Sequence, residues 1–496
     1  MSGRRVILGT VLLGAANIFK LGVQFAVLPI LARLLSPSAY GLVALAMPFI
    51  FFANIFSDAG LSKMLIRRDS VTPVLESTVF WISTAISGGL ALCVCLIAWP
   101  MAMIVRQPGE APILLALAPI LLLSGMTAAP AARIWRDQKF AVFAISDVVS
   151  AGVGVAVAIL AALHGWGAWS LVAQQITLWT VRCAWLIAAS RCSITLACRP
   201  SLLKGSWAFG ANLVGLSFLD FCSRNIDNIL IGALLGVAAL GEYSMAYQVM
   251  RMPEIIIAGP VYTALFSTLS RIKTERDKFN RIALACLTLV ATVVLPVFGG
   301  LAVVSDLAVG TILGPKWGPA AIMLIMLAPA GVAFCINCVL GAMLSALGRS
   351  AVQLRMAMII TGGTAVGVLV GTFGHTSGVA MGVSAAMIVA AIPFLRLVSR
   401  ETQIPILQLL GCFNAPGLAT TVMIASVLTL RNLERSMAPA MLLPVCIGLG
   451  GLTYVVTLAL VSGPQLLQEA KDFLSARKAP PTLESTAIST AEPLVA

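Results

Sequence analysis

The sequence predicts an all-α polytopic membrane protein with fourteen transmembrane helices. Its composition is 59% hydrophobic and only 10% charged, with a mean hydropathy of +1.00, whereas soluble domains carry about 25% charged residues. Apolar runs of about 20 residues or more, long enough to cross a bilayer, recur along the chain. Basic residues are concentrated in every second connection between these runs. Together these features leave no room for a sizeable soluble domain.

The fourteen candidate spans follow one another with short connections. They cover residues 6–32, 40–66, 77–104, 111–134, 142–163, 167–190, 207–235, 239–268, 280–304, 318–347, 353–373, 377–397, 408–430 and 438–462. The first span follows Met1–Arg5, an arrangement that secretory signal peptides share. It is too long for the apolar region of a signal peptide and has no obvious cleavage site, so we interpret it as a membrane span.

The distribution of Lys and Arg predicts the orientation of the chain. Of the 32 basic residues, 23 lie in alternate connections beginning with the N-terminal one, and 5 lie in the opposite set. Since cytoplasmic loops are enriched in Lys and Arg, both termini are expected in the cytoplasm. The net charge of +13 is therefore explained by topology, and we expect no nucleic acid partner. The four remaining cations lie within spans; they are Lys20, Arg182, Arg224 and Arg251.

The stretch Leu216–Pro260 carries an unusual number of charges for membrane-spanning sequence. Asp220, Arg224 and Asp227 follow one another at spacings of four and three, which places them on one face of a helix. An ionised group at membrane depth costs about 2.5–3.5 kcal/mol even on the lenient insertion scale, so such groups usually face a bundle interior or a watery cavity. We therefore expect this face to line a hydrophilic cavity between two helical lobes.

The cations within the spans are candidates for binding an anion. Lys20, Arg224 and Arg251 could together hold a diphosphate, because Arg donates two hydrogen bonds in a fork and Lys supplies a compact charge. The alternative is pairing within the protein, Arg251 with Glu254 and Arg224 with a neighbouring Asp. Arg182 either lines the cavity or extends to the membrane surface.

The acidic residues within the spans are candidates for ion coupling or for cavity lining. These residues are Asp58, Asp220, Asp227 and Glu254. Membrane carboxylates relay protons or bind coupling cations. For Asp58 the alternatives are capping a helix break before Gly60 or pairing with Lys63. The 11 Cys are scattered through apolar runs, and no phosphate-binding loop, HExxH or GxSxG motif occurs, so we expect no metal, no cofactor and no enzyme activity.

The sequence also contains an internal repeat. Leu34–Gly41 (LLSPSAYG) matches Leu234–Gly241 (LLGVAALG) without a gap at an offset of 200. Later matches at offsets of 210 and 211 keep the same order of spans, which predicts two parallel six-span copies. The predicted domains are an N-lobe at 1–200, a C-lobe at 201–400, two further spans at 401–462, and a cytoplasmic tail at 463–496 that is partly disordered.

Several motifs resemble those of a known family of membrane proteins. They are Leu34–Gly41, Phe56–Ile66 (FSDAGLSKMLI), Gly165–Gln175 (GWGAWSLVAQQ), Asn225–Gly232 (NIDNILIG) and Leu240–Tyr247 (LGEYSMAY). Over nearly its whole length the chain resembles the Wzx-type polysaccharide transporter flippases of the multidrug/oligosaccharidyl-lipid/polysaccharide (MOP) exporter superfamily. Gln24 stands where lipid II flippases of this superfamily tend to have a second cation in the first span, which argues against lipid II as the substrate.

The resemblance implies a V-shaped bundle of two six-helix lobes with two extra C-terminal helices, in the bacterial inner membrane. It implies export of an undecaprenyl-diphosphate-linked oligosaccharide by alternating access, for exopolysaccharide, capsule or O-antigen synthesis, with a polysaccharide polymerase and a chain-length regulator as partners. Lys20, Arg224 and Arg251 would meet the diphosphate and anionic sugars. The alternatives are a cation-coupled multidrug antiporter of the same superfamily and, less consistent with the short outer loops, a membrane polymerase or ligase.

Overall fold

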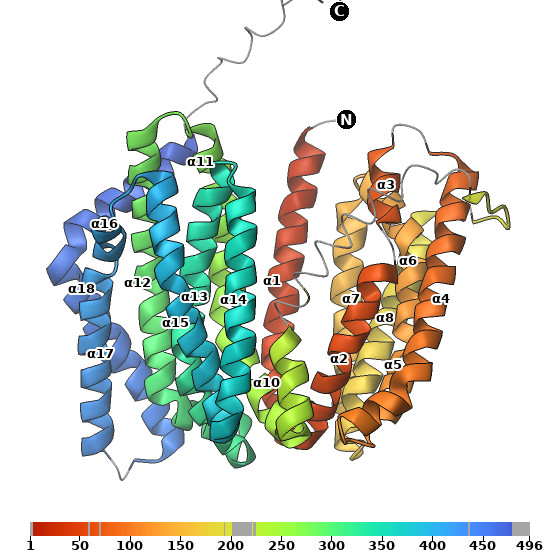
Figure 1. Cartoon of the computed structure of the whole chain (residues 1–496), viewed down its shortest axis with the longest axis horizontal. Coiled ribbons are helices and arrows are strands. Elements are labelled where there is room, and N and C mark those ends of the chain that lie inside the picture. The colour runs from red at the N-terminus through yellow and green to blue at the C-terminus, as the bar shows by residue number, and fades with distance from the viewer. Residues whose placement is uncertain are drawn as a thin grey trace, which may run out of the picture. The chain divides into compact units, whose positions relative to one another are not determined.

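The computed structural model describes residues 3–57, 60–68, 71–192, 194–200, 221, 225–434 and 437–478. Helices and their connections account for these ranges, in which no strand is found, so the predicted all-α class is confirmed for them (Figure 1). Within the same ranges eleven helical stretches are long and apolar enough to cross a membrane, and two shorter apolar helices, Gly22–Leu34 and Asn225–Leu235, accompany them. The chain is therefore a multi-pass membrane protein.

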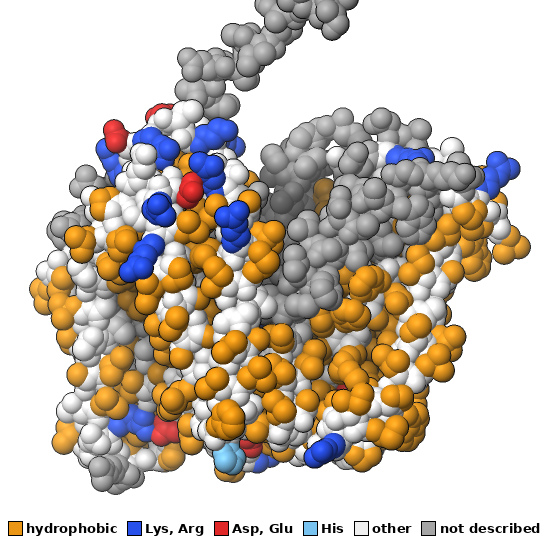
Figure 2. Space-filling view, in the orientation of Figure 1, with side chains coloured by type: hydrophobic (Ala, Val, Ile, Leu, Met, Phe, Trp, Pro, Cys, Tyr) orange, Lys and Arg blue, Asp and Glu red, His pale blue; other side chains and the backbone are white. Residues whose placement is uncertain are grey.

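The exposed faces of the helices have the composition that lipid contact requires. Along α4 (Pro73–Ile104) the exposed residues include Leu92, Leu96, Trp99 and Met103, which are three to four residues apart and 56–70% exposed. Figure 2 shows hydrophobic side chains over the middle of the helices, with Lys and Arg gathered near helix ends. Such a surface would aggregate in water and is stable only against acyl chains.

The chain divides into two compact units, of which unit 1 comprises residues Met1–Gln248, Ser305–Met326 and Thr361–Val383. Its helices include α1 (Gly3–Leu34), α2 (Pro37–Ser57), α3 (Leu61–Arg67), α4, α5 (Glu110–Leu117), α6 (Pro119–Arg136), α7 (Phe140–Leu163), α8 (Ala168–Ser190), the helix Asn225–Leu235 and most of α10 (Val237–Pro253). The most extensive packing joins α7 to α8, α4 to α6 and α1 to α7.

Helix boundaries in unit 1 follow local sequence signals. At the start of α4 the Thr72 hydroxyl accepts a hydrogen bond from the backbone N–H of Leu75 at 3.3 Å, and Pro73 occupies the first helical position. The helix Asn225–Leu235 turns into α10 at Gly236, whose φ of +87° is readily accessible only to glycine. The helices α7 and α8 agree with the predicted spans 142–163 and 167–190 to within two residues.

The backbones of α2 and α10 approach each other closely and reciprocally in unit 1. A Cβ atom added to Gly41 would collide with the carbonyl of Val237, and one added to Gly241 would collide with the carbonyl of Pro37. Both glycines and both carbonyl residues are related by the offset of 200 that the repeat predicts. This exchange of equivalent partners is the pattern that a local twofold axis produces.

Unit 2 comprises Val249–Val304, Leu327–Ile360 and Ser384–Ala496. Its helices, some of which continue from unit 1, are the end of α10, the π-helix η2 (Glu254–Ala258), α11 (Gly259–Arg271), α12 (Arg276–Ala308), α13 (Gly318–Ala346), α14 (Ser350–Gly371), α15 (His375–Thr402), α16 (Ile406–Gly411), α17 (Asn414–Leu433) and α18 (Pro439–Lys478). The Tyr454 hydroxyl of α18 donates a 2.6 Å hydrogen bond to the Thr292 carbonyl of α12. Ser462 departs from helical geometry inside α18, where the predicted last span ends.

Replacing Gly241 with Leu tests the contact between α2 and α10. The new side chain meets backbone rather than a flexible side chain, so we expect a loss of at least the 1–3 kcal/mol or so that overpacking typically costs. The thermal unfolding midpoint in detergent should fall well below that of the control Gly89→Leu, whose Cβ on α4 meets open space. Equal midpoints for the two variants would contradict the close approach.

Candidate functional site

A cavity of about 320 Å³ lies within unit 1, between α1, α2, α7, α8 and α10. Its apolar walls come mainly from Val, Leu and Ala side chains of α1, α2, α7 and α8. Its polar lining residues are Lys20, Gln24, Tyr40, Gln174, Gln175, Ser244 and Gln248. Among the residues that the structure describes, no Asp or Glu belongs to this lining.

Lys20 supplies the positive charge of the cavity. One face of α1 is turned toward the cavity, since its lining residues are spaced three to four apart, at Lys20, Gln24, Val27 and Leu31. Lys20 is half-buried, and none of the ion pairs found among the described residues includes it. Its ammonium is therefore available to an anionic ligand.

The amide side chains define the remaining chemistry of the cavity. Each Gln offers two N–H donors and a carbonyl acceptor, and the hydroxyls of Ser244 and Tyr40 can donate or accept. Such groups suit a ligand with many hydroxyls, and the Lys20 ammonium favours an anionic one. A cationic ligand would find no carboxylate among the lining residues of the described ranges.

At one end of the cavity, backbone carbonyls at the end of α1 are capped by side chains. Lys316 Nζ donates to the Arg33 carbonyl at 2.7 Å, and Trp317 Nε1 donates to the Ala32 carbonyl at 2.8 Å. The Arg33 guanidinium in turn donates to the carbonyls of the π-helix η3 (Val309–Leu313). The cavity residue Tyr40 meets the fully buried Trp317 edge to face, with ring centroids 5.3 Å apart. Carbonyls at the end of α1 and in η3 are thus satisfied by side chains.

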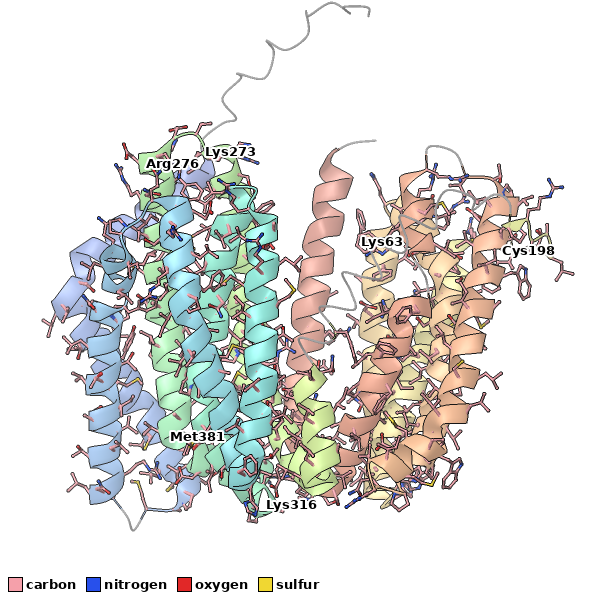
Figure 3. The ribbon with its side chains drawn as sticks, in the orientation of Figure 1. Lys63, Cys198, Lys273, Arg276, Lys316 and Met381 are labelled. Atoms are coloured by element: carbon pink, nitrogen blue, oxygen red, sulfur yellow. The ribbon has the colours of Figure 1, made fainter. Side chains whose placement is uncertain are left out.

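The opposite end of unit 1 carries clustered basic residues, and we call it the basic end. It is defined by Lys63, Arg133, Arg136 and Lys139, which lie around α3 and the junction of α6 and α7. Lys63 and Cys198 lie at this end, and Lys316 lies at the other (Figure 3). Since α1 runs from the basic end toward Lys316, Lys20 is the lining residue of α1 nearest the basic end.

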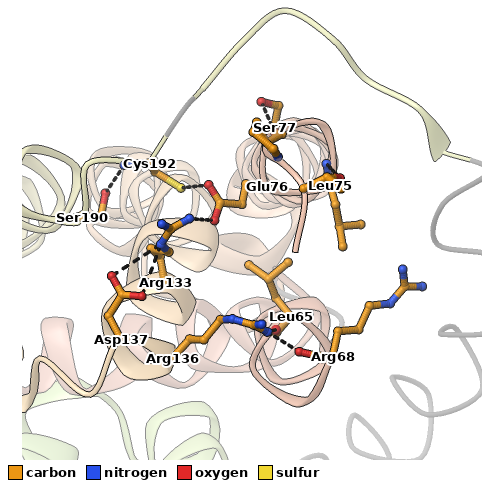
Figure 4. A network of polar contacts seen from close by, with 12 residues as sticks. Leu65, Arg68, Leu75, Glu76, Ser77, Arg133, Arg136, Asp137, Ser190 and Cys192 are labelled. Carbon is orange, nitrogen blue, oxygen red and sulfur yellow. Dashed lines mark hydrogen bonds and ion pairs between the residues drawn. The ribbon is translucent and has the colours of Figure 1, made fainter. Parts of the chain in front are cut away.

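A polar network ties helix ends together at the basic end (Figure 4). Glu76, whose side chain is 1% exposed, is paired with Arg133 and accepts a 3.3 Å hydrogen bond from the Cys192 thiol. Arg133 also pairs with Asp137 at 3.4 Å. Arg136 donates to the Arg68 carbonyl after α3. The network joins α3, α4, α6 and the segment that follows α8, and thereby fixes the basic end.

Two groups of this network titrate outside their ordinary ranges. Burial and then the Glu76 carboxylate raise the pKa of the Cys192 thiol to about 12, so it stays protonated and can donate. Burial opposes the ionisation of Asp137, but Lys139 and Arg133 outweigh it and hold the pKa of Asp137 below its usual value. The stability that Asp137 contributes is therefore complete above its unfolded pKa and is lost as pH falls through its lower folded pKa.

The predicted acidic candidates that the structure describes are engaged in contacts. Asp227 is 4% exposed and accepts hydrogen bonds from the Tyr243 hydroxyl and the Asn228 backbone N–H, each at 2.9 Å. Tyr243 is completely buried and stacks on Tyr247. Asp227 thus joins the helix Asn225–Leu235 to α10, and it is not among the residues that line the cavity.

In unit 2, Arg251 and Glu254 form the ion pair that was weighed against anion binding. Arg251 Nε lies 3.1 Å from Glu254 Oε2. The Arg251 side chain is 26% exposed and the Glu254 side chain 21%. The pair spans the point where α10 becomes the π-helix η2, and π-bulges are frequent at functional sites. Asp58, Asp220 and Arg224 lie outside the described residues.

One charged residue of the spans was missed by the sequence argument. Asp147 of α7 lies 3.2 Å from Arg182 of α8, and the Arg182 guanidinium stands over the rings of Phe143 and Trp179 at 5.2 and 5.6 Å. An isolated carboxylate within the predicted span 142–163 was the available signal. Its partner on another helix could not be recognised from spacing.

The model of the polysaccharide biosynthesis protein family matches residues 30–322, more than half of the chain. The chain belongs to this family. The succinoglycan biosynthesis transport protein ExoT of Rhizobium meliloti (strain 1021) is 28% identical to this chain, and the similarity covers 92% of this chain and 93% of ExoT. The similarity to Wzx-type polysaccharide transporters is therefore confirmed.

Two solved structures place this family member in a known fold. The lipid II flippase MurJ, in an inward closed conformation, superposes with a TM-score of 0.72 at 15% identity, covering 91% of this chain and 98% of MurJ. An inward-facing multidrug resistance MATE transporter of the MOP superfamily superposes with a TM-score of 0.61 at 17% identity, covering 77% and 96% of the two chains. These likenesses show a helical fold similar to those of MurJ and MATE transporters.

Replacing Arg133 with Gln should destabilise unit 1, because the buried Glu76 carboxylate would lose its counter-charge. Removing one partner of a buried ion pair costs about 3–5 kcal/mol. The double variant Glu76→Gln/Arg133→Gln leaves no lone charge and should recover most of the thermal unfolding midpoint in detergent.

Lys63→Gln is the matched control for this experiment, since Lys63 is exposed at the same end and belongs to none of the ion pairs among the described residues. It should leave the midpoint nearly unchanged. If Arg133→Gln behaved like Lys63→Gln, the network would not hold the basic end together.

Proposed function

We propose that this protein is a flippase that moves undecaprenyl-diphosphate-linked oligosaccharide repeat units across the bacterial inner membrane by alternating access. The observation that carries the proposal is the cavity of unit 1, where Lys20 stands among amide and hydroxyl groups inside a membrane-embedded bundle. The family membership and the transport role printed for ExoT support it. The product would enter exopolysaccharide, capsule or O-antigen synthesis.

The cavity chemistry suits both parts of such a headgroup. A diphosphate requires cations, and an ammonium in a low-dielectric site attracts it more strongly than in water. Sugar hydroxyls are donors and acceptors at once and match the side-chain amides of Gln24, Gln174 and Gln175. The apolar walls exclude competing water from these contacts.

Further residues of the route belong to the same proposal. Arg224 and Arg251 would join Lys20 in meeting the diphosphate and any acidic sugars. Arg251 would have to exchange Glu254 for the substrate, which its partial exposure permits. The carboxylates proposed for ion coupling or for lining the route are Asp58, Asp220, Asp227 and Glu254.

Alternating access requires two lobes that move against each other, and fourteen spans provide two lobes of six with two additional helices. The helical stretch Ala351–Thr402 has 52 residues, too long for one crossing of a hydrocarbon core of about 30 Å. It contains α14 and α15, separated by a 3₁₀ turn, and therefore accounts for two spans. Together with the two shorter apolar helices, these stretches support the proposed number of fourteen spans.

A cation-coupled multidrug antiporter is the second candidate, because such transporters share the fold. A pocket for cationic drugs requires acidic residues, and the described part of this cavity's lining has a Lys and no carboxylate. A transport assay with a cationic dye separates the two functions. An enzyme of polymer synthesis is disfavoured by the transporter relatives.

A polysaccharide polymerase and a chain-length regulator are the proteins that would act next on the translocated units. The lipid bilayer itself is the second partner, since the substrate tail stays within it.

Replacing Lys20 with Gln should strongly reduce polymer export while leaving the protein in the membrane, because the cavity would lose its charge. Lys20→Arg keeps the charge and should retain much of the export. Arg224→Ala should abolish export. Export can be measured as surface polysaccharide in a strain whose own transporter gene is deleted. Full export by Lys20→Gln and Arg224→Ala would count against a cation-dependent route.

The proposed orientation places both termini in the cytoplasm and the turn between α7 and α8 in the periplasm. An epitope inserted after His164, where the chain is exposed, should therefore be accessible from the periplasm alone. An epitope after Lys273, between α11 and α12, should be accessible only from the cytoplasm. The reverse labelling pattern would overturn the orientation.

A further inference from the structure

The ion pair of Asp147 and Arg182 continues the lining of the cavity toward the basic end. On α7 the lining residues Ala151 and Val155 follow Asp147 at steps of four. On α8 the lining residue Leu178 precedes Arg182 by four. Because residues four apart share a helix face, both charged residues lie one turn beyond the cavity on the faces that line it. Lys20 is the α1 residue nearest the same end.

The contacts of Arg182 hold its guanidinium in place without saturating it. The central carbon of the guanidinium lies 5.2 Å from the ring centroid of Phe143 and 5.6 Å from that of Trp179. The rings therefore position the cation and stabilise it through their π faces. The Arg182 side chain is 21% exposed, so its guanidinium keeps some accessible surface, whereas the Asp147 Oδ1 atom that faces it is buried. A guanidinium has five N–H donors, and its Asp147 contact occupies few of them.

The contact between the two charges is also loosely formed. The Asp147 Oδ1 atom lies 3.2 Å from Arg182 Nη2, within ion-pair distance, yet it accepts no well-directed hydrogen bond from the described residues. A charge pair inside a membrane protein costs desolvation, and an apolar pair of similar volume would often be equally stable. Charges retained at this depth usually serve a ligand or ion path.

We propose that Arg182 is a second anion-binding residue of the cavity and that Asp147 is its positioning residue. This inference rests on the proposed function. An incoming diphosphate would take the guanidinium as a fork of two hydrogen bonds, while Lys20 supplies the second charge across the same end of the cavity. Asp147 keeps the guanidinium aimed and neutralised until the anion arrives, and it therefore competes with the substrate.

The competition predicts opposite effects of two substitutions. Removing the guanidinium with Arg182→Gln removes a charge-assisted hydrogen-bond pair and should weaken diphosphate binding about tenfold. Removing only the charge of Asp147 with Asp147→Asn frees the guanidinium and should tighten binding about threefold to tenfold. A pair with a purely structural role would weaken binding in both variants or in neither.

The test uses the full-length protein in lipid nanodiscs with undecaprenyl diphosphate as the ligand. Undecaprenol, which has the same tail and no charge, is the control ligand, and inorganic pyrophosphate is the soluble competitor. Binding is followed by intrinsic tryptophan fluorescence, with Trp179→Phe identifying the contribution of the ring that faces Arg182. Asp147→Asn/Arg182→Gln leaves no lone charge, so it tests the loss of the guanidinium even if Arg182→Gln fails to fold.

The outcomes separate the inference from the proposed function. If the wild-type protein binds undecaprenyl diphosphate no better than undecaprenol, the proposed function fails and the inference fails with it. A second outcome is that the wild type prefers undecaprenyl diphosphate to undecaprenol and Lys20→Gln weakens this binding. If Asp147→Asn then fails to tighten binding, and the variants without Arg182 bind like wild type, the inference alone is overturned. Tighter binding by Asp147→Asn together with weaker binding by the double variant establishes it.

Discussion

The close approach of two backbones at Gly41 and Gly241 is the constraint on which the cavity of unit 1 depends. In lipid the hydrophobic effect does not drive helices together, so van der Waals packing between small residues contributes more to their association. Here each helix places a glycine against a carbonyl of the other. Beside this contact, α2 lines the cavity with residues from Tyr40 to Met47, and α10 lines it with Ser244 and Gln248. A side chain at either glycine would separate these walls.

The placement of charge follows from the cost of burying it. Glu76 and Arg133 form a fully committed pair at the basic end, reinforced by a thiol and a second carboxylate. In the pair of Arg182 and Asp147 the carboxylate is less deeply buried than Glu76, and its Oδ1 atom accepts no well-directed hydrogen bond from the described residues. Lys20 has no acidic partner among the residues that the structure describes. The charged residues are thus less fully paired toward the cavity than at the helix ends. Glu76 and Arg133 hold the fold, whereas Arg182 and Lys20 can bind a ligand.

Much of the fold could be predicted because the membrane restricts the options. A run such as 167–190 must form a helix in lipid, since every backbone N–H and C=O has to be satisfied within the segment, and α8 covers Ala168–Ser190. Local departures were harder to predict. The α5–α6 break at Pro119 and the π-helix η2 after Pro253 interrupt apolar runs whose composition does not change at those points.

The sequence by itself determined the all-helical membrane class, the repeat at an offset of 200 and the polar face of α1 that carries Lys20 and Gln24. These depend on composition, spacing and periodicity, which are properties of single helices. Only the tertiary structure decided that Asp227 is held by Tyr243 while Arg182 meets Asp147 beside the cavity. The reason is physical: whether a membrane charge is neutralised or available depends on the facing side chains of other helices, and helical periodicity contains no information about which helices meet.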